Sequence, residues 1–418
     1  MTRRFADSTS PDKAATFAAM SDERTISPAN GTDDVKPGRD GRRRLVLVGG
    51  GHAHLEVVRQ LGLNPVAGLD LVLVAKELNA PYSGMLPGLI AGTNSFDDCH
   101  VDLTRLGAFA GARVIHGEVD GIDRAARRVS VAGQAPLDYD LLSLDVGITP
   151  GMAGIRGAGT YGIAVKPISG FHPKWLDLLA RCLAPGGPRD IAVVGAGAAG
   201  YEIAQAVRRR IMAEADARGI DGAAFGFTLV AGGALLSGSN ACARRYARSE
   251  LAAAGIRLVE GDPVGEIAAD RLVLASGLEL ACEAAILCTP GRAASWFGET
   301  GLPLDDNGFF AVRPTLQSTG DEDVFAAGDC AGMIGQQRPK AGVFAVRQGP
   351  FLAGNIVRRA EGREPIPYRP QRHYLTLLSN AQESAVAARG RFALRGRLFS
   401  RWKDHIDRKF MRRYKDLA

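Results

Sequence analysis

Asp323-Val-Phe-Ala-Ala-Gly328-Asp329-Cys330-Ala331 is the stretch that decides the fold of this chain. Its apolar residues predict a buried strand, which ends at the pair Gly328-Asp329 and continues into a turn of small residues. A Gly-Asp pair after a strand is common, so this stretch alone is moderate evidence for a ligand site. Two glycine-rich loops upstream strengthen the evidence, because each follows an apolar strand and precedes a helix.

The two upstream loops share one arrangement, in which a predicted strand turns sharply into a predicted helix. They read Gly49-Gly50-Gly51-His52-Ala53-His54 after the strand 45–48, and Gly195-Ala-Gly197-Ala-Ala-Gly200 after the strand 191–194. Glycines let the backbone approach a pyrophosphate, and the helix N-terminus offers N–H donors and the positive end of a dipole. One such loop is weak evidence, whereas two of them predict two dinucleotides in one protein.

The length and composition indicate a globular protein with more than one core. The chain has 418 residues, of which 46% are hydrophobic, and this is enough for two or three cores. Residues 1–44 lack apolar periodicity and are predicted to be a disordered extension. Neither a secretory leader nor a run of ~20 apolar residues is found, so we expect a cytoplasmic protein, or one bound peripherally to the cytoplasmic membrane face.

Cysteine chemistry is not predicted. The six cysteines, at positions 99, 182, 242, 282, 288 and 330, form no C-x-x-C pair. Two sulfurs within bonding reach are needed for dithiol redox chemistry, and suitably spaced Cys or His pairs are needed for zinc. We therefore expect no metal, and we interpret Cys330 as a small buried residue beside Asp329.

The basic charge is concentrated at the C-terminal end. Residues 391–418 hold ten Lys and Arg against three Asp, although the net charge of the whole chain is only +6. A nucleic-acid-binding protein would carry a basic stripe on its folded body, so no nucleic acid is expected. The tail has apolar residues at helical spacing, which predict an amphipathic helix; they are Leu398, Phe399, Trp402, Ile406 and Phe410.

This helix has two interpretations. In the first, the helix lies on an anionic lipid surface. In the second, its apolar stripe packs on the body of the protein, covers the flavin or forms a homodimer contact. Asp404 and Asp407 interrupt its basic face, and this favours packing over the membrane.

Together these motifs resemble the two-dinucleotide flavoproteins of the pyridine nucleotide-disulfide oxidoreductase superfamily, which includes type II NADH dehydrogenases, sulfide:quinone reductases and ferredoxin reductases. Segments 48–54, 81–88, 338–349 and 402–411 carry a narrower likeness, to the NADH-dehydrogenase-like flavoprotein that some organisms fuse to selenide, water dikinase. The resemblance implies an α/β fold with two Rossmann-like (three-layer ββα) domains. It places the FAD-binding domain in residues 45–163 and 300–350, the NAD(P)-binding domain in 164–299, and a C-terminal interface region in 351–418.

The resemblance also implies which residues hold the cofactors. Asp329 would bind the ribityl chain of FAD, and the start of the helix at about Phe344, with Lys340, would face flavin O2. The turn-rich loop 80–88 would cover the flat isoalloxazine ring, or its apolar members would belong to the core. The FAD-binding residues predicted are Gly49, Gly50, Gly51, His52, Ala53, Lys76, Ser83, Gly84, Val119, Gly147, Gly328, Asp329, Lys340 and Ala341. Those predicted for NAD(P) are Gly195, Gly197, Gly200, Glu202, Gly232 and Gly291.

Three positions depart from the superfamily pattern. Ala75 and Ala231 stand where an acidic residue usually binds a ribose, which leaves Glu77 or Lys76 as candidates at the first site and NADH against NADPH open at the second. His54 replaces the third glycine of the first loop. We therefore expect either a displaced helix or an imidazole that leaves the helix–strand interface.

The chemistry implied is hydride transfer, with Glu202, Lys166 and Lys340 as the catalytic candidates. Glu202 would lie near the nicotinamide, or would only stabilise the helix N-terminus, and Lys166 would pair with Glu202 near flavin N5. The function predicted is an FAD-dependent NAD(P)H oxidoreductase that passes electrons to a quinone or another small acceptor. An alternative is a flavin-binding accessory protein of selenium or sulfur metabolism with little turnover. A sulfide:quinone reductase-like enzyme is a weaker one, because only Cys330 lies near the site.

Overall fold

The structure is a computed structural model, and it describes residues 41–417. The predicted extension 1–44 lies outside these residues except for its last four. Arg43 and Arg44 already belong to the first strand, so the folded body begins two residues earlier than predicted.

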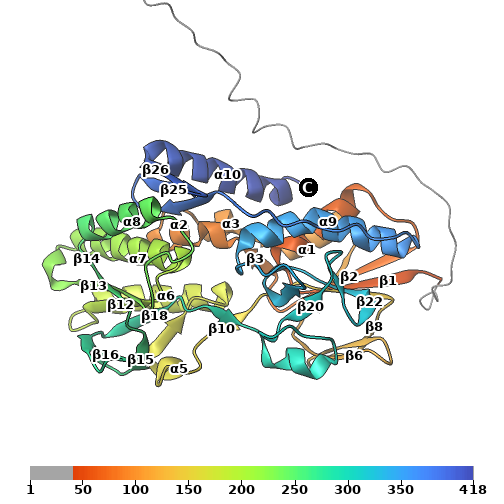
Figure 1. Cartoon of the computed structure of the whole chain (residues 1–418), viewed down its shortest axis with the longest axis horizontal. Coiled ribbons are helices and arrows are strands. Elements are labelled where there is room, and N and C mark those ends of the chain that lie inside the picture. Colours follow the sequence, from red (N-terminus) through yellow and green to blue (C-terminus); the bar gives the residue numbers. More distant parts are fainter. Residues whose placement is uncertain (1–40, 418) are drawn as a thin grey trace, which may run out of the picture. The chain divides into compact units, whose positions relative to one another are not determined.

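An eight-stranded mixed sheet forms the first half of the body, and Figure 1 labels its strands β1, β2, β20 and β22. The strand order is β23-β20-β21-β22-β9-β1-β2-β5. Its strands are β1 Arg43–Val48, β2 Leu69–Ala75, β5 Arg113–His116, β9 Leu141–Leu144, β20 Phe310–Val312, β21 Gln317–Ser318, β22 Asp321–Ala326 and β23 Ala331–Met333. Because β1, β9 and β22 are parallel neighbours, their carboxyl ends meet at one edge of the sheet. This edge brings together Gly49, Asp145 and Gly328, which are far apart in the sequence.

A five-stranded parallel sheet forms the second half, in the order β11-β18-β12-β13-β14. Its strands are β11 Gly162–Ala164, β12 Asp190–Val194, β13 Gly226–Ala231, β14 Ile256–Glu260 and β18 Ala284–Leu287. In the sequence, all strands of this second sheet lie between β9 and β20, which both belong to the first sheet. The predicted α/β class with two nucleotide-binding units is therefore confirmed, while the exact domain boundaries remain predictions.

Short sheets complete the strands. They are β3 Asn79–Pro81 with β4 His100–Asp102; β6 Val119–Asp123 with β7 Arg128–Val131 and β8 Leu137–Asp138; β10 Thr149–Pro150 with β19 Gly291–Arg292; β15 Val264–Ile267 with β16 Arg271–Leu274 and β17 Glu279–Ala281; and β24 Thr376–Ser379 with β25 Ala385–Arg389 and β26 Phe392–Gly396. The sequence patterns described above did not predict the sheet of β24, β25 and β26.

Helices cover the sheets and carry the C-terminal region. The α-helices are α1 His52–Leu63, α2 Leu86–Ala91, α3 Phe96–Cys99, α4 Leu103–Phe109, α5 Ala158–Tyr161, α6 Ile168–Leu183, α7 Ala198–Asp216, α8 Ala241–Ala253, α9 Gly342–Ala360 and α10 Arg397–Lys415. Short 3₁₀ turns lie at Ser83–Met85, Gly222–Ala224, Ser295–Thr300 and Gly328–Cys330. Helix α9 packs along α1 and continues past the predicted boundary at residue 350.

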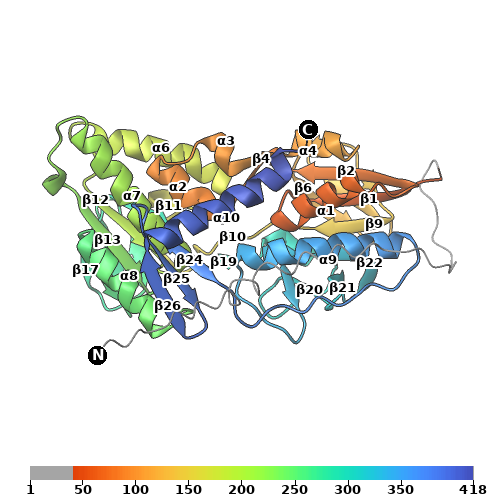
Figure 2. The same cartoon turned by 90° about the horizontal axis from the view of Figure 1, so that it is seen from above.

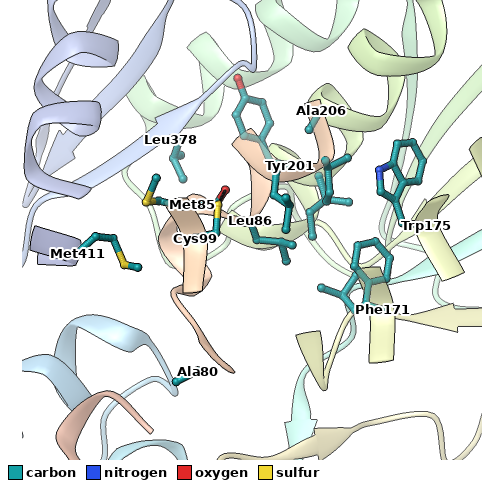
Figure 3. Close-up of a cluster of buried hydrophobic side chains, with 14 of the residues drawn as sticks. Ala80, Met85, Leu86, Cys99, Phe171, Trp175, Tyr201, Ala206, Leu378 and Met411 are labelled. Carbon is teal, nitrogen blue, oxygen red and sulfur yellow. Dashed lines mark hydrogen bonds between the residues drawn. The ribbon is translucent and has the colours of Figure 1, made fainter. Parts of the chain in front are cut away.

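The loop 80–88 is not an open loop. It forms a 3₁₀ turn and the helix α2, and α2 packs against α7 of the second half. Met85 and Leu86 are buried in one core cluster with Phe171, Trp175 and Tyr201 (Figure 3). The apolar residues of segment 80–88 are therefore core residues, because they pack against helix α7.

Helix α10 lies across the region between the two sheets (Figure 2). One of its faces contacts the body, where Asp407, Met411 and Tyr414 are buried. The opposite face stays open, with Leu398, Trp402 and Ile406 exposed by 75%, 41% and 38%. The predicted stripe is thus divided, because Phe410 packs inward while these three residues do not.

Candidate functional site

The first glycine loop forms a tight cradle at the end of β1. Gly49 has a φ of +95°, and a Cβ there would collide with the backbone of Asp145. A Cβ on Gly51 would collide with the carboxylate of Asp145. Only glycine fits these two positions, as expected for a turn that holds a phosphate group closely.

Asp145 is a site residue that the sequence reasoning missed. It follows β9, and its Oδ2 accepts hydrogen bonds from the backbone N–H groups of Ala53 (2.8 Å) and His54 (3.2 Å) in the first turn of α1. Its carboxylate also lies against Gly328, so it touches both motifs predicted to bind FAD. Burial raises the pKa of Asp145 to about 7. An acidic residue directly after a buried strand, two positions before Gly147, was the available signal.

His54 stays inside the helix–strand interface, so the expectation that its imidazole leaves this interface is wrong. The other alternative, a displaced helix, remains a prediction. Its Nδ1 lies 2.7 Å from the carbonyl oxygen of Gly49, and its Nε2 lies 2.8 Å from Oγ of Ser143 on β9. Burial lowers the pKa of His54 to about 4, so the ring is neutral near pH 7. The imidazole therefore joins α1 to the sheet through hydrogen bonds, where a glycine would join them by close packing.

His52 carries a polar atom that no described residue satisfies. Its Nε2 is buried without a hydrogen-bond partner, and burial lowers the pKa of His52 to about 4. Its ring lies 5.5 Å from the Tyr82 ring and 5.7 Å from the Phe410 ring, measured between centroids. Asp329 and Lys166 are close enough to influence its pKa. A buried ring nitrogen with no partner is the kind of atom that a bound ligand satisfies.

Asp329 and Lys166 form an ion pair with 2.8 Å between Oδ2 and Nζ. The predicted pair of Lys166 with Glu202 is therefore wrong. Lys166 follows β11, and β18 separates β11 from β12, which leads to Glu202 on α7. The neighbouring Gly328 N–H donates to Oε1 of Gln348 on α9 (2.7 Å), and this bond holds the Gly-Asp turn against that helix.

Lys340 and Ala341 lie just before α9, which begins at Gly342 with Ala341 as its N-cap. The Lys340 ammonium donates to the carbonyl of Ala331 (2.6 Å) and lies 3.7 Å from the centroid of the Phe309 ring. Both residues line a hollow of about 120 Å³ that Gly328 and Asp329 also line. The role of Lys340 toward flavin O2 remains a prediction.

The outer residues predicted to bind FAD are less tightly placed. Lys76 is exposed and pairs with Glu118 (2.7 Å), beside Val119 at the start of β6. Gly147 has a φ of +75°, a conformation that glycine tolerates best. Ser83 and Gly84 form the 3₁₀ turn that follows Tyr82.

The second glycine loop follows the same plan with fewer side chains. Gly195 has a φ of +105°, and a Cβ there would meet the backbone of Cys288. A Cβ on Gly200 would collide with the carbonyl of Gly195, so α7 rests directly on the loop. Thr289 Oγ1, next to Cys288, is buried, and no residue within 41–417 forms a hydrogen bond with it. Of the outer predicted residues, Gly232 packs against Pro263, and a Cβ on Gly291 would collide with Ile148.

Glu202 lies in the first turns of α7 and faces the C-terminal region. Its Oε1 accepts the backbone N–H of Ser379 (2.9 Å), and burial raises its pKa to about 7. The charge of Lys403 on α10 opposes that shift. Glu202 is therefore more than a helix-terminal charge, because its carboxylate connects α7 to the C-terminal sheet.

The described residues contain no cluster suited to a metal, and their six cysteines are all free thiols. Cys330 is fully buried, and burial raises its pKa to about 12, in agreement with a structural residue. The two glycine cradles and the unpartnered atoms of His52 and Thr289 fit two dinucleotides. Gly49–Ala53, Gly328 and Asp329 would hold FAD, and Gly195, Gly197 and Gly200 would hold NAD(P)H.

Comparison with known proteins agrees with this geometry. Residues 43–349 match the Pyridine nucleotide-disulphide oxidoreductase family. The chain belongs to this family. Rhodocoxin reductase of Rhodococcus erythropolis is 26% identical over 374 residues, which are 82% of this chain and 79% of the relative. Internal alternative NAD(P)H-ubiquinone oxidoreductase A1 of Arabidopsis thaliana is 24% identical over 370 residues, 79% of this chain and 70% of the relative.

The fold of this family member is also found in NDH2 from Plasmodium falciparum, solved in complex with NADH. The two structures match with a TM-score of 0.77 at 15% identity, over 89% of this chain and 97% of the other. The protein is an FAD-dependent NAD(P)H oxidoreductase, as the resemblance to two-dinucleotide flavoproteins implied. The described residues include no helix with the length and apolar character that crossing a bilayer requires.

Proposed function

We propose that this oxidoreductase takes a hydride from NAD(P)H and delivers the electrons to a quinone or another small acceptor. FAD supplies the chemistry when bound, because its ring accepts a hydride and passes electrons on. The chain supplies position and electrostatics. The observation that carries the proposal is the pair of glycine cradles, one at the carboxyl edge of each sheet, with Asp329 beside the first.

Three side chains take defined roles in this proposal. Glu202, held in position by the Ser379 N–H, would border a bound nicotinamide. Lys166 would orient Asp329 toward the ribityl chain of FAD through their ion pair. Lys340, held over Phe309, would contribute positive charge to the flavin site.

Anaerobic mixing of the purified yellow protein with NADH, and separately with NADPH, tests the proposal. We expect loss of the flavin band at ~450 nm within seconds with at least one nucleotide. Absence of bleaching with both would instead favour the accessory protein of selenium or sulfur metabolism. The missing acidic residue at Ala231 is the observation behind that second candidate.

A sulfide:quinone reductase-like activity has less support. It would need a cysteine pair at the flavin, and the one cysteine beside Asp329 is Cys330. This thiol is fully buried with a pKa raised to about 12, which makes it a poor nucleophile.

We also propose peripheral contact with an anionic membrane through the open face of α10. Leu398, Trp402 and Ile406 line this face, and Phe392 and Leu394 of β26 are exposed by 72% and 61%. Arginines flank both elements, so apolar and basic groups occur together as lipid binding requires. Flotation with anionic and with zwitterionic vesicles tests this contact. Binding to neither, with a dimer seen by light scattering, would assign the face to a homodimer instead.

A further inference from the structure

A cleft separate from the two glycine cradles lies between α2, the β24–β25 turn and the first half of α10. It has room for about 360 Å³. Gly88 and Asn94 line it on one side, Ser379 and Gln382 on the second, and Arg401 on the third. This volume matches the lower end of small-molecule sites in proteins.

The wall of this cleft is hydrophilic. Among its 18 lining residues, apolar side chains come only from Met85, Pro87, Ala91 and Ala381. Four basic and three acidic residues also line it, namely Arg397, Arg401, Lys403 and Arg408 with Glu383, Asp404 and Asp407. Such a wall suits a polar molecule better than an isoprenoid chain, because burying these charges against an apolar ligand would leave them without water.

One cation on this wall is free to meet a ligand. Each of the three acids pairs with a base, as Arg397 with Glu383, Lys403 with Asp407 (2.7 Å) and Arg408 with Asp404 (2.9 Å). Among residues 41–417, Arg401 makes no ion pair, and its side chain is exposed to the cleft. The lining therefore carries one excess positive charge, located on a guanidinium that recognises oxyanions well.

The floor of the cleft touches the predicted flavin site. Lys403 donates to the carbonyl of Gly84 (2.6 Å), and Asp407 accepts from the Tyr82 hydroxyl (3.1 Å). The Tyr82 ring in turn contacts His52, whose Nε2 lacks a partner. Burial works against the charge of Lys403, but Glu202 and Asp407 raise its pKa above the ordinary value, so this floor remains charged. Contacts from Asp407 to Tyr82 and from Tyr82 to His52 thus connect the cleft to the first cradle.

We propose that this cleft binds a polar, anion-bearing two-electron acceptor through Arg401, over the floor formed by Lys403 and Asp407. The inference rests on the proposed function and names the class of its acceptor. The nicotinamide is oxidised as it loses a hydride, which carries two electrons and one proton. The acceptor gains both electrons and two protons, the second of which comes from solvent.

Direct binding tests the cleft without any turnover. Titration calorimetry compares naphthalene-2-sulfonate with neutral 2-naphthalenemethanol on the purified holoprotein. We expect tighter binding of the sulfonate, and Arg401→Gln should weaken it by about three- to tenfold while leaving the neutral compound unchanged. Arg401→Lys should retain most of the affinity. Arg412→Gln is the matched control, because Arg412 is exposed on the same helix outside the cleft.

Kinetics with NAD(P)H provide a second readout. The KM for 1,4-naphthoquinone-2-sulfonate should rise in Arg401→Gln by the same factor, with no change for 1,4-naphthoquinone. Equal sulfonate binding by wild type and Arg401→Gln would overturn the proposal, and so would equal losses in Arg401→Gln and Arg412→Gln. Anaerobic bleaching by NAD(P)H is read separately, so failure of the proposed function and failure of the cleft are distinguishable.

Discussion

The two glycine loops follow one backbone plan but fill it with different side chains. Each turns from a parallel strand into a helix, with a first glycine at a φ of +95° or +105°. In the second loop, Gly200 rests on the carbonyl of Gly195 and backbone meets backbone. In the first, His54 occupies the corresponding position, and Asp145 binds the N–H groups of the helix start.

The difference shows that a close helix–strand junction can be built in two ways. The second loop relies on the absence of side chains. The first relies on the neutral imidazole of His54 and the buried carboxylate of Asp145. Both form hydrogen bonds with polar groups that would otherwise need the ligand or water as a partner. The two loops should therefore respond differently to substitution, pH and added methyl groups.

The largest effect is expected at the all-glycine loop. Gly200→Ala places a Cβ against the Gly195 carbonyl, a backbone atom that can move only with the whole turn. We expect the KM for NAD(P)H to rise by roughly a hundredfold, equivalent to about 3 kcal/mol, while the protein stays yellow. Stopped-flow reduction measures this change. Retention of wild-type reduction kinetics would contradict the backbone junction. Gly159→Ala is the control, because Gly159 is exposed in α5 with open space around its Cα.

The next effect is at the first loop and concerns FAD. Gly51→Ala directs a Cβ at the Asp145 carboxylate, so we expect FAD affinity to fall by about tenfold to a hundredfold, or 1–3 kcal/mol. The flavin content of the purified protein and its FAD dissociation constant measure the loss. Because the obstacle is a side chain, the double variant Gly51→Ala, Asp145→Ala should recover part of the affinity. A double variant no better than Gly51→Ala would show that Asp145 is not the obstacle.

The third test concerns the imidazole junction and is read in the stability of the fold rather than in nucleotide affinity. His54→Ala removes hydrogen bonds to Gly49 and Ser143 and leaves a cavity, so we expect unfolding to become easier by about 2–4 kcal/mol. Thermal unfolding of the FAD-saturated protein measures the change. His405→Ala, at an exposed position on α10, is the control. Equal melting temperatures for the two variants would remove His54 from the junction.

The smallest effect distinguishes the two buried acids by pH. Burial raises the pKa of both Asp145 and Glu202 to about 7, above an unfolded value of about 4. A raised pKa means that the folded state holds a proton that the unfolded state has lost, so this stability is complete below pH ~4 and is lost as pH rises through about 7. Asp145→Asn and Glu202→Gln should each flatten the decline in stability between about pH 5 and 7.

FAD affinity separates these two variants, because only Asp145 lies in the first cradle. Ionised Asp145 repels the pyrophosphate, so wild-type affinity should decrease by a few-fold from about pH 6 to pH 8. Asp145→Asn should abolish this decrease, and Glu202→Gln should leave it unchanged. An unchanged pH profile in Asp145→Asn would show that the carboxyl does not face the pyrophosphate.

Patterns along the sequence were sufficient for the α/β class, the two cradles and the strand before Gly328-Asp329, which ends at Ala326. These features are local, since apolar periodicity predicts the strands, and glycines are needed where the turn leaves no room for a Cβ. The interpretation of Cys330 as a small buried residue was also correct, because the buried residues next to it in the sequence already indicated a buried position. The resemblance of the motifs to flavoproteins pointed to the family.

The partners of long-range side chains could be decided only by the tertiary structure. Lys166 pairs with Asp329 rather than Glu202, and His54 bonds Ser143 across the interface, because strand order and sheet edges set these distances. The apolar members of 80–88 became core residues for the same reason, as α2 meets α7. Asp145 directly follows β9 in the sequence, yet its role depends on two motifs that only the sheet brings to its carboxylate. The sequence determined which backbone turns form, since that depends on neighbouring residues; the fold decided which charges meet, since that depends on how distant strands are ordered.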